Sequence, residues 1–255
     1  MGVPILVIEN LHKAFGRVQA ADNINLTINE GVLTSVIGPN GAGKSTLINM
    51  LSGSLQVDSG RVIFQGTDIT HLAIHRRVHM GLCRSFQVVN VFPELSVFDN
   101  IQIPVLTILN RSHKLFRSII KEKTARIEVN RILDMIGLAP EAQTPASALS
   151  HGDQRVLEVG IALAAKPKLL FLDEPTAGMN PVERVKILDN IRRLSAIGET
   201  TFVIVEHDMD VVFSLSERVI VLHHGAVIAD GSTADVQTNP RVREVYLGEE
   251  VHHDS

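Results

Sequence analysis

The 255-residue chain has a single cysteine, Cys83, so it can form no internal disulfide and no zinc site built from cysteines. It also lacks an excess of basic residues, since its formal net charge is −4 and its isoelectric point is near 6.3. The charge of the chain therefore gives no indication of a nucleic-acid partner. One cysteine fits a reducing compartment, and 45% hydrophobic with 20% charged residues is typical of a globular protein.

Long hydrophobic runs are also missing. A membrane-spanning helix needs about 18 or more consecutive apolar residues, and the nearest candidate here is residues 97–109. That run is interrupted by Asp99, Asn100, Gln102 and Pro104. The N-terminal segment lacks the charged and apolar regions of a signal peptide. If the chain works at a membrane, we expect it to dock onto a partner that spans the bilayer.

The most informative motif is GPNGAGKST at residues 38–46, which fits the phosphate-loop pattern G-x-x-x-x-G-K-[ST]. Glycines allow consecutive backbone N–H groups to turn toward an anionic phosphate. Lys44 then reaches the β- and γ-phosphates, and Ser45 offers its hydroxyl to Mg²⁺. A strand pattern precedes the loop and a helix pattern follows it, so the positive end of that helix points at the phosphate. We expect ATP to bind through Gly38, Pro39, Asn40, Gly41, Ala42, Gly43, Lys44, Ser45 and Thr46.

A second candidate site lies at the end of the apolar run 169–172, which is followed by Asp173 and Glu174. A strand buried on both faces can carry carboxylates only at its exposed carboxyl end, where ligands bind in parallel sheets. Asp173 is suited to a Mg²⁺ shell, and Glu174 to polarising a water toward the γ-phosphate. Alone, the pattern would read as a strand ending in a polar turn. The phosphate loop upstream favours the catalytic interpretation.

The remaining patterns predict an α/β fold in one domain. Short strand patterns flank the phosphate loop and indicate an antiparallel layer beside a mostly parallel sheet. Residues 90–162 favour helices, and buried-strand patterns return after Pro167 with helices between them. We therefore expect a single unit over 1–255, with a core at about 1–89 and 163–255 and a helical insertion subdomain at about 90–162. The strands are expected at 3–11, 24–28, 32–37, 61–64, 168–172, 201–205 and 218–222.

The segment LSHGDQ at 149–154 begins a helix expected to run to Lys166, and Ser150 with Asp153 forms an S-x-x-D cap. This segment also resembles the LSGGQ signature of ATP-binding cassette (ABC) ATPases. It precedes the strand with Asp173 and Glu174, as that family requires. The resemblance covers nearly the whole chain and extends to three further motifs. RSFQ is similar to the Q-loop with Gln87, GMNP at 178–181 to the D-loop, and VEHD to the switch region with His207.

The resemblance implies roles for individual residues. Glu174, His207 and Lys44 would be catalytic, and Ser45, Gln87 and Asp173 would hold the metal. Phe15 would stack on adenine, and Ser150, Gly152 and Asp153 would contact the ATP of a second subunit. Two departures from the family pattern stand out, because His151 replaces the first signature glycine and Phe15 replaces the commoner tyrosine. We expect altered affinity from them, not loss of function.

The family resemblance also implies partners. They are integral membrane permease subunits, a second cassette ATPase that is identical or a paralogue, and indirectly an external solute-binding protein. The chain would then be peripheral, at the cytoplasmic face of the membrane. GDQR at 152–155, EHDM at 206–209 and YLGE at 246–249 resemble the branched-chain amino acid importer ATPases, as does an insertion over 106–116. Urea or amide importers and the lipopolysaccharide-exporting ATPase remain alternatives.

A soluble ABC ATPase of DNA repair or translation is a further alternative. That class usually carries a long coiled-coil insertion or two cassettes, and this chain has one cassette and no heptad run.

The docking surface for a permease is expected near Gln87 and residues 90–105, where VVNVFP at 88–93 is unusually apolar.

Overall fold

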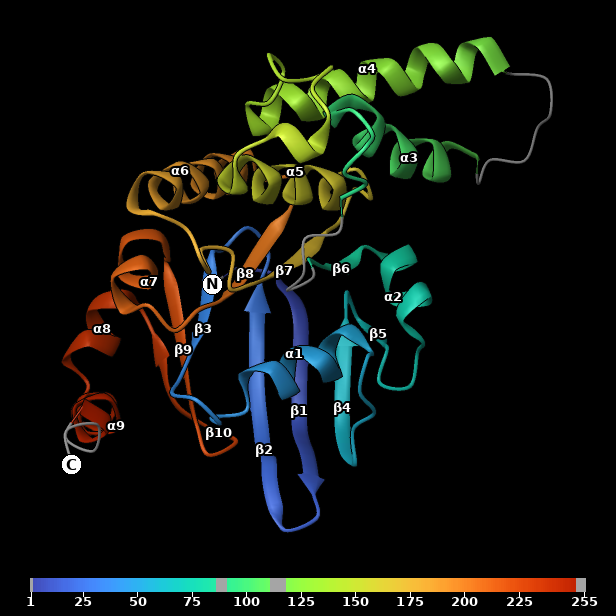
Figure 1. Ribbon diagram of the computed structural model, residues 1–255. Helices are drawn as coiled ribbons and strands as arrows, with labels where there is room; N and C mark the ends of the chain where they lie inside the picture. Colours follow the sequence, from blue (N-terminus) through green and yellow to red (C-terminus); the bar gives the residue numbers. More distant parts are fainter. Residues whose placement is uncertain (1, 86–90, 111–117, 251–255) are drawn as a thin grey trace.

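The computed structural model describes residues 2–85, 91–110 and 118–250, and two sheets organise them (Figure 1). The larger sheet has six strands in the order β10-β9-β3-β8-β7-β6, and all neighbours but β10 and β9 run parallel. Its strands are β3 (Thr34–Ile37), β6 (Leu82–Arg84), β7 (Leu169–Asp173), β8 (Thr201–Val205), β9 (Arg218–His223) and β10 (Ala226–Gly231). The chain therefore has the parallel α/β core that its buried-strand patterns predict.

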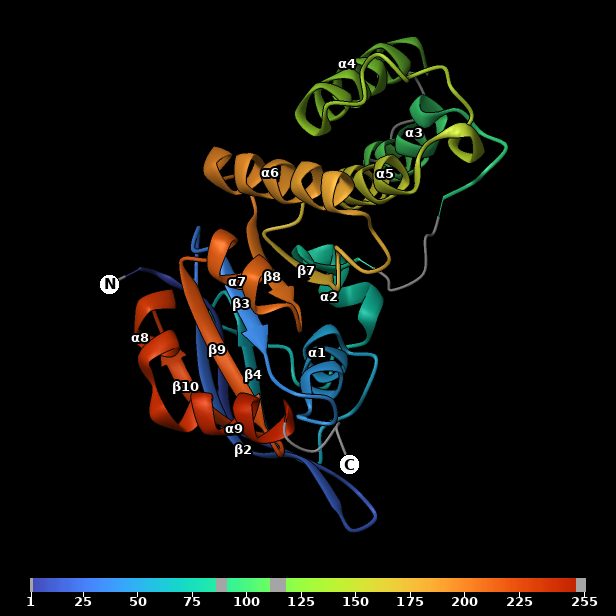
Figure 2. The ribbon, with the colours of Figure 1, turned by 60° about the vertical axis from the view of Figure 1, so that its left-hand side comes forward.

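The second sheet is antiparallel, with the order β2-β1-β4-β5. It consists of β1 (Pro4–Phe15), β2 (Val18–Asn29), β4 (Ser59–Phe64) and β5 (Thr67–Asp68). One hydrophobic cluster joins this sheet, the larger sheet and α1 (Lys44–Ser52), through residues such as Leu6, Leu47 and Val203. The helix after the phosphate loop is thus fixed between two sheets (Figures 1 and 2).

Strand β7 shows how the larger sheet is covered on both faces. Successive side chains of a strand point to opposite faces, and all five of its residues are buried. Leu169 and Phe171 join the cluster around α1, whereas Leu170 and Leu172 join a second cluster with the helices. These helices are α3 (Val97–Asn110), α4 (Ser118–Ile136), α5 (His151–Leu163) and α6 (Pro181–Ile197). A Cβ at Gly160 would lie 2.6 Å from Ile136 Cδ1, so glycine permits the close approach of α5 and α4.

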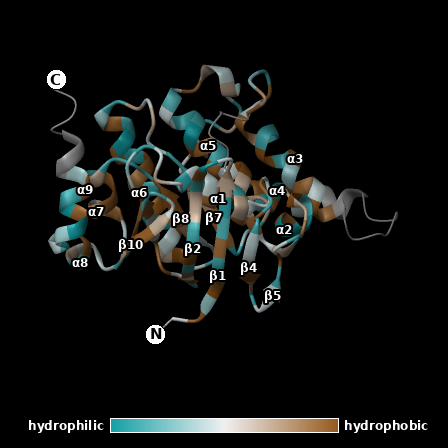
Figure 3. Ribbon diagram, turned by 90° about the horizontal axis from the view of Figure 1, so that it is seen from below, coloured by the Kyte–Doolittle hydropathy of each residue, from teal (hydrophilic) through white to brown (hydrophobic). Residues whose placement is uncertain are grey.

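The C-terminal helices pack beside the outer strands β9 and β10. Figure 3 shows hydrophilic residues on the outer turns of α8 and α9. A third hydrophobic cluster joins these helices to β9 through Val221, Val236 and Val242. The helices not yet named are α2 (Ile74–Met80), the 3₁₀ turn at Ala146–Ala148, α7 (Met209–Leu215), α8 (Thr233–Thr238) and α9 (Pro240–Glu250). Within the described residues, no helix combines the length and the apolar character that crossing a membrane requires.

The α/β fold class is confirmed, and several element boundaries differ from the prediction. Strand β1 continues to Phe15 and does not end at residue 11. The sequence pattern does not reveal this continuation, because register shifts between β1 and β2 interrupt the alternation of apolar and polar residues that marks a strand. Helix α5 ends at Leu163, not at Lys166, and residues 97–110 form a helix despite Pro104. The division into a core and a helical subdomain stays a prediction.

Arg77 fixes the far end of the phosphate-loop helix. This side chain is 2% exposed, and its guanidinium donates to the backbone oxygens of Met50 and Leu51 at 2.8 and 2.7 Å. It also donates to the oxygens of Thr70 and Leu72, both at 2.9 Å. The last carbonyls of a helix have no partner within the helix, and a cation there is favourable for the helix dipole. Arg77 therefore completes α1 at its carboxyl end.

We predict that Arg77→Met lowers the free energy of unfolding by about 3 kcal/mol, because four carbonyl oxygens lose a hydrogen bond from the buried guanidinium. Urea denaturation measures this change. The exposed neighbour provides the matched control, and Arg76→Met should change the same quantity by no more than about 0.5 kcal/mol. Equal stability of the two variants would contradict this account of α1.

Candidate functional site

The predicted site residues meet at the carboxyl edge of the larger sheet. Strand β3 is followed by the phosphate loop, β7 ends at Asp173, and β8 is followed by Glu206 and His207. Strand β6 ends at Arg84 on the same edge, because β6, β7, β8 and β3 are parallel. This is the edge where open parallel sheets bind ligands. Strand order thus gathers segments that are far apart in the sequence.

The phosphate loop is held between two backbone segments. A Cβ at Gly38 would lie 2.2 Å from the Leu222 oxygen, and one at Gly43 would lie 2.4 Å from the Ala20 oxygen. Such distances exclude any side chain at either position without a shift of the backbone. Gly225 donates its N–H to the Ala42 oxygen at 2.9 Å. The loop conformation is therefore imposed by its surroundings as well as by its own sequence.

Lys44 lies under this loop. Its Nζ donates to the backbone oxygens of Gly38 at 2.5 Å and Pro39 at 3.0 Å, and the residue is 9% exposed. An ammonium held by neutral carbonyls can exchange them for anionic phosphate oxygens, which form stronger hydrogen bonds. Ser45 is exposed at the start of α1, and Asn40 and Gly41 are exposed in the loop.

The two acids after β7 have different surroundings. Asp173 is buried, and its Oδ2 accepts from Arg84 Nη2 at 2.5 Å. Glu174 has a φ of 45°, in the left-handed region that non-glycine residues rarely adopt, and its N–H donates to the Val205 oxygen at 2.9 Å. His207 Nδ1 lies 3.7 Å from Glu174 Oε1. The structure thus brings together Glu174 and His207, which the sequence analysis placed in one site.

A buried contact between Thr176 and Glu206 joins the loops after β7 and β8. Thr176 donates to Glu206 Oε1 through its hydroxyl at 2.6 Å and its N–H at 3.2 Å. The N–H of His207 donates to the other oxygen, Oε2, at 3.3 Å. Burial raises the pKa of the Glu206 carboxyl, and these hydrogen bonds act in the opposite direction. The motifs predict no role for Glu206, although an acid directly after a buried strand is a pattern that could have indicated one.

The signature residues lie at the start of α5, in the helical layer and apart from α1 (Figures 1 and 2). The predicted cap is confirmed, since Ser150 Oγ accepts from the Asp153 N–H at 3.1 Å. Asp153 also forms an ion pair with Lys186 on α6. Gly152 donates its N–H to Glu183 at 3.3 Å, and a Cβ there would lie 3.0 Å from that side chain.

Phe15, the residue predicted to stack on adenine, lies at the end of β1. It is 51% exposed, with Lys13 Nζ 5.6 Å from the centre of its ring. Its ring is therefore exposed and is not part of the hydrophobic core. Gln87 lies outside the described residues, as does most of the apolar segment 88–93.

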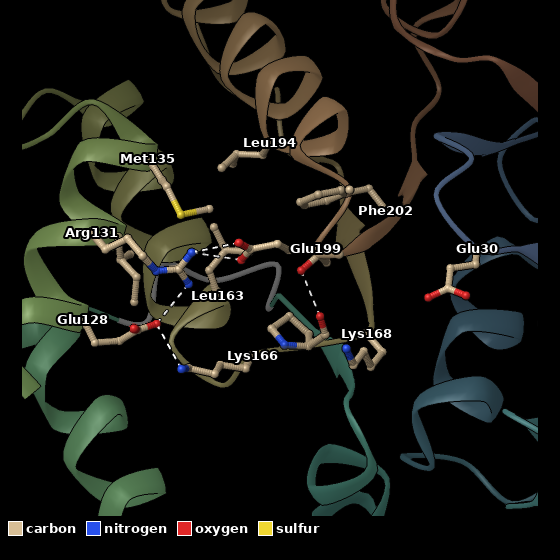
Figure 4. A pocket seen from close by; sticks show the side chains of 14 residues that line it. Glu30, Glu128, Arg131, Met135, Leu163, Lys166, Lys168, Leu194, Glu199 and Phe202 are labelled. Atoms are coloured by element: carbon tan, nitrogen blue, oxygen red, sulfur yellow. Dashed lines mark hydrogen bonds and ion pairs between the residues drawn. The ribbon is translucent and has the colours of Figure 1, made fainter. Parts of the chain in front are cut away.

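A cavity of about 390 Å³ lies at the opposite edge of the sheet, where Lys168 precedes β7 and Thr200 precedes β8. Four of its charged side chains form a network of ion pairs, which consists of Glu128, Arg131, Lys166 and Glu199. Arg131 on α4 donates to Glu128 and to Glu199, each at 3.0 Å (Figure 4). This cavity is the seam between α4 and the sheet, and it is remote from the phosphate loop.

We predict that Glu206 makes stability fall with pH over a limited window. Its folded-state pKa lies above the ordinary 4.5, so the folded protein keeps this proton after the unfolded chain has lost it. The favourable contribution is complete below about pH 4.5 and is lost as pH rises through the raised value. Urea denaturation across this range should show a steeper decline for the wild type than for Glu206→Gln. The exposed Glu244→Gln variant should follow the wild type, and identical slopes for all three proteins would contradict the prediction.

Comparison with known proteins agrees with this geometry. The family described as "ABC transporter" matches residues 21–177, and "Branched-chain amino acid ATP-binding cassette transporter" matches residues 226–252. The high-affinity branched-chain amino acid transport ATP-binding protein BraF of Pseudomonas aeruginosa is 35% identical over 254 residues, which are 98% of this chain and 100% of that protein.

Two solved structures extend the similarity to the fold. The crystal structure of an ATP-binding cassette of an ABC transporter in its ADP conformation has a TM-score of 0.83 and 33% identity, over 96% of this chain and 99% of that one. A dimeric ATP-binding cassette in a post-hydrolysis state, bound to ADP and Pi, has a TM-score of 0.73 and 26% identity, over 89% and 98% of the chains. The chain therefore belongs to the ABC transporter family, as an ATP-binding cassette of the branched-chain amino acid type.

Proposed function

We propose that this protein hydrolyses ATP to power the uptake of branched-chain amino acids through membrane permease subunits. The observation that carries the ATPase part is the convergence of Lys44, Glu174 and His207 at one edge of the sheet. The solute is supported by the family match at residues 226–252 and by the name of the Pseudomonas aeruginosa relative.

ATP binds with its phosphates in the loop 38–46. Backbone N–H groups of the loop and the start of α1 face the phosphates, and Lys44 exchanges the oxygens of Gly38 and Pro39 for them. Phe15 is an exposed ring that can stack on the adenine. Each contact places a group of matching charge or shape against the nucleotide.

The donor set beside the loop fits Mg²⁺. A hydroxyl from Ser45 and a carboxylate from Asp173 are hard oxygen ligands, which Mg²⁺ prefers. The family resemblance adds the amide of Gln87, which lies outside the described residues. Among the described residues, no group of three or more His, Cys, Asp or Glu could hold a metal by itself. The ion would therefore need phosphate oxygens and water as further ligands. A Mg²⁺ held by Ser45 and Asp173 would supply positive charge against the β- and γ-phosphates.

Glu174 is the general base of the reaction. Its carboxylate accepts a hydrogen bond from a water and polarises that water toward the γ-phosphate. His207, 3.7 Å away, orients this carboxylate and donates toward the phosphate oxygens. The strained backbone at Glu174 is consistent with a side chain held in a functional position.

A second cassette, identical or a paralogue, completes the site. The helix that begins after Ser150 presents a second positive N-terminus, and a γ-phosphate between two such ends is neutralised from both sides. Ser150, Gly152 and Asp153 would make this contact across the dimer. The dimeric relative bound to ADP and Pi supports an assembly of two cassettes.

The permease docks on the helical region close to the site. Phe92 is 55% exposed, and Leu95 and Ile103 add exposed apolar surface within the expected range 90–105. These residues come after β6 in the chain, and their exposed apolar side chains suit contact with a permease helix. An external binding protein would deliver the solute, and the cassette would lie at the cytoplasmic face of the membrane.

The uptake of labelled leucine, isoleucine and valine at low external concentration tests this proposal. Deleting the gene should abolish uptake, and the wild type should restore it. Lys44→Ala should fail to restore it, whereas Arg61→Met, which alters an exposed ion pair with Glu9, should succeed. Unchanged uptake of all three amino acids with loss of urea or amide uptake would refute the solute. Unchanged uptake with a defective outer membrane would indicate an exporter.

A further inference from the structure

Arg84, the last residue of β6, bridges two elements of the proposed site. Its Nη2 donates to Asp173 Oδ2 at 2.5 Å, and its Nη1 donates to Asn49 Oδ1 at 2.5 Å. The side chains of Arg84 and Asp173 are largely buried, with 15% and 2% of their surfaces exposed. Arg84 therefore ties the carboxylate at the end of β7 to the helix that follows the phosphate loop.

This bridge fixes the separation of the two proposed metal ligands. Asn49 lies one turn after Ser45 on α1, and residues four apart share one face of a helix. Holding Asn49 and Asp173 with one planar guanidinium thus sets where the Ser45 hydroxyl lies relative to the Asp173 carboxylate. A lysine cannot replace this fork, because its single ammonium lacks two donors in a rigid plane.

Arg84 also determines how much negative charge Asp173 offers. A carboxylate buried to this degree is unfavourable without a cation, and here the chain itself supplies one. A divalent ion that approaches Asp173 meets a carboxylate already neutralised and a guanidinium that repels the ion. The phosphates of ATP bring the negative charge that offsets this repulsion.

We propose that Arg84 is a positioning residue that makes metal entry depend on the nucleotide. It holds the Asp173 carboxylate in a fixed position relative to the Ser45 hydroxyl, and its charge keeps Mg²⁺ from binding to this carboxylate before ATP binds. The inference rests on the proposed function, which assigns Asp173 and Ser45 to the metal. It adds a reason why the metal and ATP enter together.

Binding of Mn²⁺ to the folded full-length protein, followed by electron paramagnetic resonance, tests this role without reference to turnover. Without nucleotide, Arg84→Met should bind Mn²⁺ at least about tenfold more tightly than the wild type, because one repelling charge beside the ligand is removed. The same gain should disappear in the double variant Arg84→Met with Asp173→Asn. Arg84→Lys keeps the charge and should bind nucleotide-free Mn²⁺ as weakly as the wild type. Arg61→Met removes an exposed arginine and should also match the wild type.

Two results distinguish failure of this inference from failure of the proposed function. Equal Mn²⁺ dissociation constants for folded Arg84→Met and wild type would overturn the role of Arg84. Failure of the wild type with ATP to bind one Mn²⁺ per chain would instead overturn the metal site of the proposed function. Where Arg84→Met does not fold, Arg84→Gln replaces it, since a neutral amide keeps a hydrogen bond while it removes the charge. The tenfold criterion is the same for that variant.

Discussion

The whole site depends on a phosphate loop pressed between backbone carbonyls. The oxygens of Leu222 and Ala20 approach Gly38 and Gly43 so closely that no side chain fits at either position. These carbonyls belong to β9 and β2, which lie in different sheets. The loop conformation is therefore a consequence of how the two sheets pack around α1. Arg77 at one end of that helix and Lys44 at the other keep it in place.

Buried charge follows the same design on the neighbouring strands. Two carboxylates are buried at the carboxyl edge, Asp173 at the end of β7 and Glu206 directly after β8, and each has a partner on another segment of the chain. Arg84 donates a hydrogen bond to Asp173, and Thr176 donates to Glu206 through its hydroxyl and its N–H. Burying a carboxylate requires such partners, and the partners also fix the position of the side chain. Contacts that make the acids compatible with the fold thus also orient them for chemistry.

The part of the site carried by local motifs could be predicted from the sequence. The glycines and Lys44 of the loop act within nine residues, and Asp173 with Glu174 follows from a strand that ends in acids. The contact of Arg84 with Asp173 joins residues 89 positions apart, and it depends on β6 lying beside β7. Strand order of this kind has no local signal. The bulged pairing of β1 and β2 was hidden for a related reason, because register shifts disturb the alternation of apolar residues.

We infer that different side chains at one edge of the sheet bind and hydrolyse ATP, with Lys44 responsible for binding and Glu174 for hydrolysis. The direct test measures ATP affinity and turnover for the same variant, Glu174→Gln, in the assembled transporter. The account predicts ATP affinity close to that of the wild type and turnover lower by about a hundredfold or more, because the amide cannot act as a base while Lys44 and the loop remain. Turnover near the wild-type rate, or loss of ATP binding together with turnover, would contradict the assignment of Glu174.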